Sequence, residues 1–266
     1  MEKKDLSSLD ELETEINKLH DFLKSKRSSP YNYISNPLFR GQRSSEWELE
    51  TTLERYLGRD VKVEAYNHYL KLIKPAIKSY TKIKWNDVTD TQNDDPFFFT
   101  PSNYEFMAYV RHHGFPSPLL DWTQSFYIAL FFAFHKASRQ ERISLYAYVR
   151  YMGGIESGSG GEPTIIEYGP YVTTDKRHFM QQGQYTICVK KHDDSWVYYC
   201  HEDYFSNAKG EEDKNYLIKY TLPCAIKNDV LKKLQTMNIN AFTLFGDEDS
   251  LMDMLAFKEI YGKQLT

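Results

Sequence analysis

The sequence LLDWTQSFYIALFFAF, residues 119–134, combines a polar run with a strongly apolar one. Its second half, IALFFAF, is apolar on every side, and a helix that is apolar all round belongs in the middle of a core. We therefore expect a central helix from about Ser125 to Ser138. The first half is polar, and either Thr123 or Ser125 can cap the helix by accepting a backbone hydrogen bond.

The same polar run has a second interpretation, as part of a binding site. Free N–H groups at a helix start attract anions, and Asp121 is available to hold an arginine. FRGQ, residues 39–42, supplies one where a predicted strand ends at Phe39 or Arg40. Arg40 offers a rigid fork of donors for phosphate or carboxylate, and Gly41 permits a tight turn or a close approach to a ligand. The structural alternative is a buried Arg40–Asp121 pair that supports a corner.

A third stretch combines charge and amides ahead of a predicted strand. KRHFMQQGQYTIC, residues 176–188, places two basic residues and a histidine before Gln181, Gln182 and Gly183. Paired glutamines form hydrogen bonds readily but supply neither an acid nor a base. The structural alternative is a polar turn that leads into the strand.

The order of the remaining elements predicts an α+β fold. Helices dominate the first half and strands the second, unlike alternating βαβ units. Helices are expected at residues 9–23, within 49–57, at 66–80, 103–113, 224–237 and 249–261. Strands are expected at 143–151, 164–172, 184–191, 195–202 and 215–223. Pro75 should kink or break its helix, and INAFTLF, residues 239–245, is interpreted as a short strand or extended link.

The domain organisation follows from these elements. We expect one domain over residues 30–262, with a mixed or antiparallel central sheet and packed helices, after an N-terminal amphipathic helix in residues 1–28. Ser8 and Glu11 have capping-box spacing. The helix carries an apolar stripe at Leu9, Leu12, Ile16, Leu19 and Leu23. This stripe either packs on its own domain, which we favour, or pairs with another copy in a homo-oligomer.

Composition excludes several functions. The net charge of −4 argues against a dedicated nucleic-acid face. Cys188, Cys200 and Cys224 lack Cys-x-x-Cys spacing and are expected to be free thiols. No run approaches the roughly 18 apolar residues of a membrane span, and no leader is apparent, so we expect a cytoplasmic protein. His112 and His113 suit a helix C-terminus better than a metal site, and the acidic run 247–253 suits a helix start, so no metal is expected.

Several motifs together resemble one known family. LFRGQ (38–42), with Trp47 after it, resembles the opening of the FRG domain, named for Phe-Arg-Gly. Residues 112–134 are similar to its most recognisable stretch, with a His-Gly-x-Pro corner and a Leu-Leu-Asp-Trp-Thr run. QQGQYTI (181–187) resembles its Gln-Gln-Gly strand, and LFGDEDSLMDML (244–255) resembles its closing stretch, with glycine where proline is usual. The resemblance extends over roughly residues 30–260 and implies a role in bacterial or phage defence.

The FRG layout is similar to that of ADP-ribosyltransferases, which implies a nucleotide ligand, NAD, and either ADP-ribosyl transfer or NAD glycohydrolysis. The resemblance implies catalytic roles for Arg40, Asp121, Thr123 and Gln182. It implies NAD-binding roles for Arg40, Gly41, Gln42, Trp122, Ser125 and Gln181. Transferases place a glutamate where this chain has glutamine, and a neutral amide cannot supply that charge. The alternative function is a non-catalytic module that binds a protein partner, with Arg40 and Asp121 structural.

Overall fold

The computed structural model describes residues 1–27, 32–87, 101, 103–137, 141–153, 162–207 and 215–261. The expected domain limits at residues 28, 30 and 262 and the expected helix end at Ser138 lie outside these ranges. Within them, no helix combines the length and the apolar character needed to cross a membrane.

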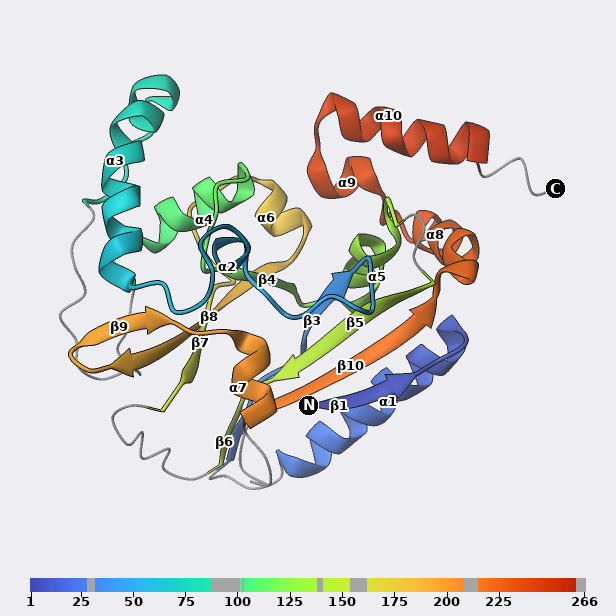
Figure 1. Cartoon of the computed structure of the whole chain (residues 1–266). Helices are drawn as coiled ribbons and strands as arrows, with labels where there is room; N and C mark the ends of the chain where they lie inside the picture. The colour runs from blue at the N-terminus through green and yellow to red at the C-terminus, as the bar shows by residue number, and fades with distance from the viewer. Residues whose placement is uncertain are drawn as a thin grey trace.

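A large mixed sheet forms the centre of the molecule (Figure 1). Its strands are β1 (Glu2–Asp5), β3 (Leu38–Gln42), β4 (Leu120–Thr123), β5 (Arg142–Val149), β7 (Thr164–Tyr168), β8 (Gly183–His192), β9 (Ser195–Tyr198) and β10 (Tyr216–Pro223). The order is β1-β10-β5-β3-β4-β8-β7, and β9 also pairs with β8. β1 runs parallel to β10, whereas the other pairings of this sheet are antiparallel. β2 (Asn32–Ile34) and β6 (Tyr151–Gly153) form a separate pair.

Helices pack around the sheet, which confirms the predicted α+β class. They are α1 (Leu9–Lys26), α2 (Thr52–Leu57), α3 (Val63–Thr81), α4 (Tyr104–His112), α5 (Phe126–Phe134), α6 (Arg177–Met180), α7 (His201–Asn207), α8 (Lys227–Thr236), α9 (Ala241–Phe245) and α10 (Glu248–Ala256). A 3₁₀ turn, η2 (Cys224–Ile226), precedes α8, and a π turn, η3 (Phe257–Tyr261), follows α10. α3 and α4 lie at one side of the sheet, and α8, α9 and α10 lie at the other (Figure 1).

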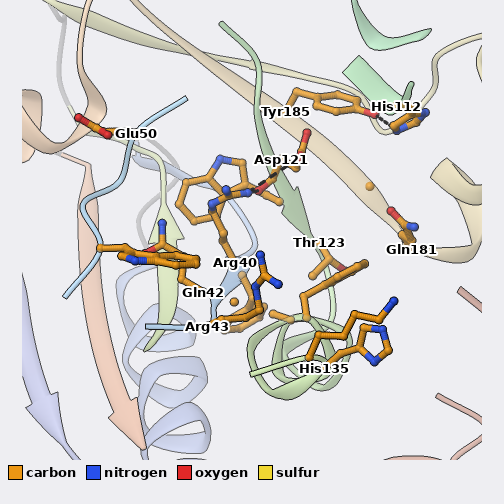
Figure 2. A pocket seen from close by; sticks show the side chains of 18 of the residues that line it. Arg40, Gln42, Arg43, Glu50, His112, Asp121, Thr123, His135, Gln181 and Tyr185 are labelled. Atoms are coloured by element: carbon orange, nitrogen blue, oxygen red, sulfur yellow. Dashed lines mark hydrogen bonds and ion pairs between the residues drawn. The ribbon is translucent and has the colours of Figure 1, made fainter. Parts of the chain in front are cut away.

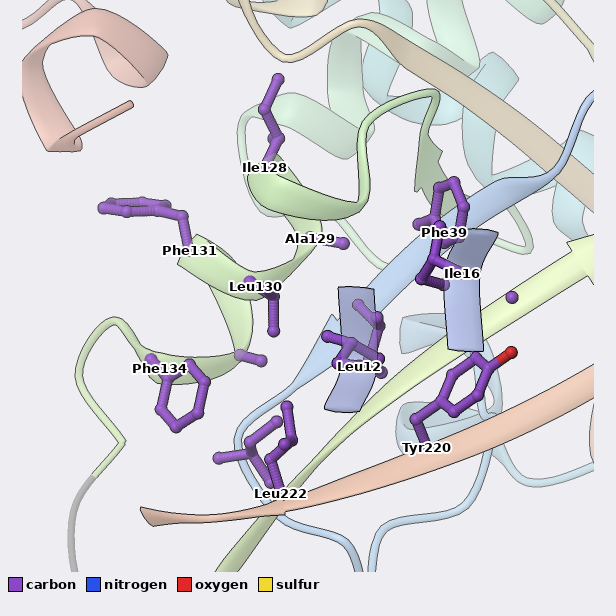
Figure 3. Packing of buried hydrophobic residues seen from close by; sticks show 14 of the residues in the cluster. Leu12, Ile16, Phe39, Ile128, Ala129, Leu130, Phe131, Phe134, Tyr220 and Leu222 are labelled. Atoms are coloured by element: carbon purple, nitrogen blue, oxygen red, sulfur yellow. The ribbon is translucent and has the colours of Figure 1, made fainter. Parts of the chain in front are cut away.

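The core is built around α5, as the sequence predicted. Ala129, Leu130 and Phe134 are fully buried, and α5 packs against β3, β5 and α8. Leu12 and Ile16 of α1 belong to the same apolar cluster (Figure 3). The α1 stripe therefore packs on its own chain, and it is not the surface through which two copies would pair.

The strand that carries Arg40 is longer than predicted. It does not end at Phe39 or Arg40 but continues through Gly41 to Gln42. A Cβ atom on Gly41 would lie 1.9 Å from the carbonyl oxygen of Ala129 in α5. Gly41 therefore allows the central helix to approach the strand closely, and it forms no turn.

Other local predictions were wrong. Residues of INAFTLF form α9, because the Asn240 side chain accepts from the Thr243 backbone and the Thr243 hydroxyl accepts from the Asn240 N–H. α3 is a single helix that contains Pro75, so the expected break does not occur, and the expected kink stays a prediction. The predicted strand at 195–202 ends at Tyr198, and His201 begins α7. β1 was not predicted from the sequence.

Candidate functional site

A cavity of about 950 Å³ lies where β3 and β4 part. The two strands are joined through a single residue pair, Phe39 with Thr123. Beyond that pair, side chains from both strands line the opening (Figure 2). The charged residues in the lining are Arg40, Arg43, Arg55, Lys136, Glu46, Glu48, Glu50 and Asp121. The volume falls within the usual range for ligand sites, about 300–1,000 Å³.

Arg40 lies inside this cavity with part of its hydrogen-bonding capacity unused. Its side chain is 15% exposed. Nη1 donates to the backbone carbonyl of Asp121 at 2.9 Å, and the Asp121 carboxylate is 3.9 Å away. The buried Nε has no partner among the described residues. Burial lowers the pKa of Arg40 to about 10, against the opposing effect of Asp121, so the guanidinium stays charged at neutral pH.

Asp121 has a closer ionic partner than Arg40. Its Oδ2 lies 2.5 Å from Nη2 of Arg111, at the end of α4. Two guanidinium groups therefore face one carboxylate at this point of the cavity. Arg111 was not predicted as a site residue, because it directly precedes His112 and His113 at a helix C-terminus and nothing in the sequence links it to the distant carboxylate.

The polar residues before α5 have two roles: some line the cavity, and one caps the helix. Thr123 lines the cavity, is 4% exposed, and its hydroxyl accepts from the Ser125 N–H. Ser125 caps α5 through the Ile128 N–H and is not part of the lining. Trp122 also lines the cavity, and its indole N–H donates to Thr186 at 2.8 Å. Trp122 and Thr123 belong to strand β4, whereas Ser125 lies beyond the strand and opens the helix.

The predicted glutamines lie in different places. Gln42 and Gln181 line the Arg40 cavity, and their amides donate to the carbonyls of Glu48 and Leu244. Gln182 has a left-handed backbone, with φ of 49°. It lines a separate cavity of about 440 Å³. Of the adjacent pair, Gln181 and not Gln182 therefore shares a cavity with Arg40.

Three aromatic residues in the cavity were missed by the sequence analysis: His112, His178 and Tyr185. The Tyr185 hydroxyl lies 2.6 Å from Nε2 of His112 and 3.3 Å from Nδ1 of His178. Burial lowers the pKa of His112 to about 4 and raises that of Tyr185. Both groups are therefore neutral at pH 7. His113, not His112, is the C-cap of α4.

The mouth of the cavity carries an aromatic platform. Trp47 is 46% exposed, and the Arg43 guanidinium lies 5.6 Å from its ring centroid. A solvated tryptophan beside a cation can stack a flat ligand ring. In the described part of the chain, no three His, Cys, Asp or Glu side chains are grouped so as to hold a metal ion.

Comparison with known proteins identifies one family. No curated protein and no solved structure matches this chain. The FRG domain model matches residues 35–142, a range that includes Arg40, Arg111, Asp121 and α5. The motifs at 181–187 and 244–255 lie outside that match. Residues 35–142 of this chain are therefore an FRG domain.

Proposed function

We propose that the Arg40 cavity binds a nucleotide of the NAD class, with Arg40 on a phosphate group. The observation that carries this proposal is the convergence of two arginines on Asp121: Arg40 from within a cavity of nucleotide size, and Arg111 from beside it. A phosphate oxygen would give these two guanidinium groups a second anionic partner besides Asp121.

The hydrogen-bonding state of Arg40 supports an anionic ligand. A buried donor without a partner costs roughly 1–3 kcal/mol, and the Nε of Arg40 is such a donor. Arginine binds phosphate through two parallel N–H···O bonds. Nη1 is already on the Asp121 carbonyl, and Nε is buried without a partner among the described residues, so a ligand oxygen would bond to Nε after a small rotation of the guanidinium.

The flat rings of a dinucleotide have a partner at the cavity mouth. Stacking of a base on an aromatic side chain contributes about 1–3 kcal/mol. Trp47 lies in the lining and exposes nearly half of its surface. We propose that Trp47 stacks on one ring of the ligand, while Arg43 contacts the Trp47 ring.

The reaction we propose is cleavage of the bond between ribose and nicotinamide, as hydrolysis or as ADP-ribosyl transfer. Such a reaction builds positive charge on the ribose, which a carboxylate stabilises. Gln182 supplies no charge and lines the other cavity. Asp121 Oδ1 has no partner among the described residues, so we assign the stabilising role to Asp121. A setting in bacterial or phage defence and a cytoplasmic location rest on the resemblance and the composition.

A structural role for Arg40 is the second candidate, within a module that binds a protein partner. Its bond to the Asp121 carbonyl ties β3 to β4 at the point where their ladder opens. On this alternative, loss of Arg40 lowers stability and no nucleotide binds.

Competition between fragments tests the binding proposal. Quenching of tryptophan fluorescence would be measured during titration with NAD, ADP-ribose and nicotinamide. We expect ADP-ribose to compete with NAD and Arg40→Ala to weaken both at least tenfold. Arg27→Ala is the matched control, because Arg27 also donates to a backbone carbonyl, that of Ser35, but lies outside the cavity. Equal weakening in both variants, or no quenching at all, would overturn the proposal.

A further inference from the structure

The residues missed by the sequence analysis form a continuous hydrogen-bonded chain along the cavity. It runs from Thr174 to His112 Nδ1 (3.4 Å), from His112 Nε2 to Tyr185 (2.6 Å), and from Tyr185 to His178 Nδ1 (3.3 Å). It ends at the carbonyl of Pro170, 2.6 Å from His178 Nε2. Tyr185 and His112 lie together beside Asp121 in Figure 2.

The last group in the chain sets the direction of every bond before it. A carbonyl oxygen can only accept, so His178 carries a proton on Nε2, and in the neutral ring it presents a lone pair at Nδ1. Tyr185 then donates its one proton to His178 and accepts from His112 Nε2–H. His112 is thereby held in the tautomer whose Nδ1 is an acceptor.

The neighbouring residues hold this series of hydrogen-bonded side chains in place. Tyr185 is 2% exposed and His178 is 1% exposed. Their rings are stacked, with planes 12° apart. A Cβ atom on Gly183 would lie 2.7 Å from His178 Nδ1, so glycine leaves the space that the ring occupies. Neither ring can rotate without losing its partner.

We propose that His112 is a catalytic residue of this cavity, which accepts a proton at Nδ1 from a ligand hydroxyl or a water, with Tyr185 and His178 as positioning residues. This inference rests on the proposed function. The contact that Nδ1 now makes, with Thr174, is long for a hydrogen bond to a hydroxyl. A water or ligand hydroxyl at a shorter distance would replace it.

Charges that face His112 come from several elements. Asp121 of β4 and Asp175 favour its protonated form, whereas Arg177 and His178 of α6 disfavour it. Burial has the largest effect and leaves the imidazole unprotonated at neutral pH. A weak base of this kind is sufficient when water attacks a reactive ribosyl cation, because the water loses its proton readily as the new bond forms.

The step balances without a further reactant. The bond between ribose C1′ and the nicotinamide nitrogen breaks, and its electron pair neutralises the ring. The oxygen of a water molecule forms a bond to C1′. The proton that this water loses moves to His112 Nδ1 and then to solvent.

Two measurements on the full chain test the assignment, namely the dissociation constant for NAD and the rate of nicotinamide release. We expect His112→Gln to bind NAD within about threefold of the native protein but to lower kcat by about 10²-fold or more. Tyr185→Phe should lower kcat less and move the acid limb of the pH–rate profile. His192→Gln is the matched control, because that histidine is 73% exposed and outside the cavity. Melting temperatures would show that each variant folds.

The outcomes separate the two proposals. Failure of the native protein to bind NAD would overturn the proposed function and this inference together. Binding without nicotinamide release, or release that His112→Gln leaves unchanged, would overturn the assignment of His112 alone. An unchanged pH profile in Tyr185→Phe would refute the positioning role.

Discussion

Replacement of Gly41 by alanine tests how the central helix packs on the strand that carries Arg40. The added Cβ would lie 1.9 Å from the carbonyl oxygen of Ala129 and 2.8 Å from the Ala133 nitrogen. Ordinary contact begins at 3.4 Å, so α5 would have to retreat by about 1.5 Å. Because the obstacles are backbone atoms inside a core, no side-chain rotation relieves them.

The magnitude follows from two opposing effects. Alanine is favoured over glycine in a strand by roughly 0.5–1 kcal/mol. Overpacking a core costs about 1–3 kcal/mol and sometimes more, and a gap of even 0.5–1 Å forfeits about a quarter to a half of each dispersion contact along the displaced helix. We expect Gly41→Ala to lower the free energy of unfolding by about 3 kcal/mol or more. The melting temperature should fall by roughly 6–12 °C.

Urea unfolding followed by circular dichroism provides the assay. Ser144→Ala is the control, because Ser144 is fully buried in the neighbouring strand and pairs with Gln42, and its loss should cost about 1 kcal/mol. The double variant with Ala129→Gly should not recover stability, since the clash involves the carbonyl oxygen. A Gly41→Ala protein as stable as the native one would refute the proposed packing.

Three further changes have defined outcomes. Asn240→Ala removes the cap of α9 and should cost about 1 kcal/mol in thermal unfolding; no change would mean that the cap is not formed. Asp121→Asn leaves Arg40 and Arg111 without a counter-charge and should lower the free energy of unfolding by about 1–3 kcal/mol. This is less than the usual loss for a buried ion pair, because the Asp121 side chain is 40% exposed. An unchanged urea midpoint would argue against the ion pair. Burial lowers the pKa of His201 to about 3, so below about pH 6.5 the unfolded chain binds a proton that the folded protein does not. The free energy of unfolding should therefore fall by about 2 kcal/mol from pH 7 to pH 5. If His201→Gln and the native protein lost stability with the same slope over that range, this prediction would be contradicted.

Elements with a strong periodic or apolar signal could be predicted from the sequence. α5 was predicted because its run has no polar face, and α1 because its stripe follows helical spacing. α9 was missed because its capping box uses Asn240 and Thr243 in place of the more familiar serine and glutamate. The role of Gly41 was predicted wrongly, because a glycine is needed there to make room for the carbonyl oxygen of Ala129. Ala129 is distant in the sequence and belongs to no motif that would link it to Gly41.

The candidate site was predictable only where motifs mark it. Arg40 and Asp121 stood out as charged residues next to apolar strands, and the structure brings them together. His112 and Tyr185 are 73 positions apart, and neither lies in a pattern that links them. Their pairing depends on how β8 and α4 meet, which residue spacing does not encode. The two adjacent glutamines point into different cavities because Gln182 adopts a left-handed backbone.

Calorimetric titration with NAD measures directly whether Arg40 anchors a nucleotide. The native protein and Arg40→Ala would be compared at equal concentration, after their melting curves show that both are folded. We expect one binding site in the native protein and at least tenfold weaker binding in the variant. Absence of heat in the native protein, together with a melting temperature that falls by several degrees in Arg40→Ala, would contradict it and assign the arginine to the fold.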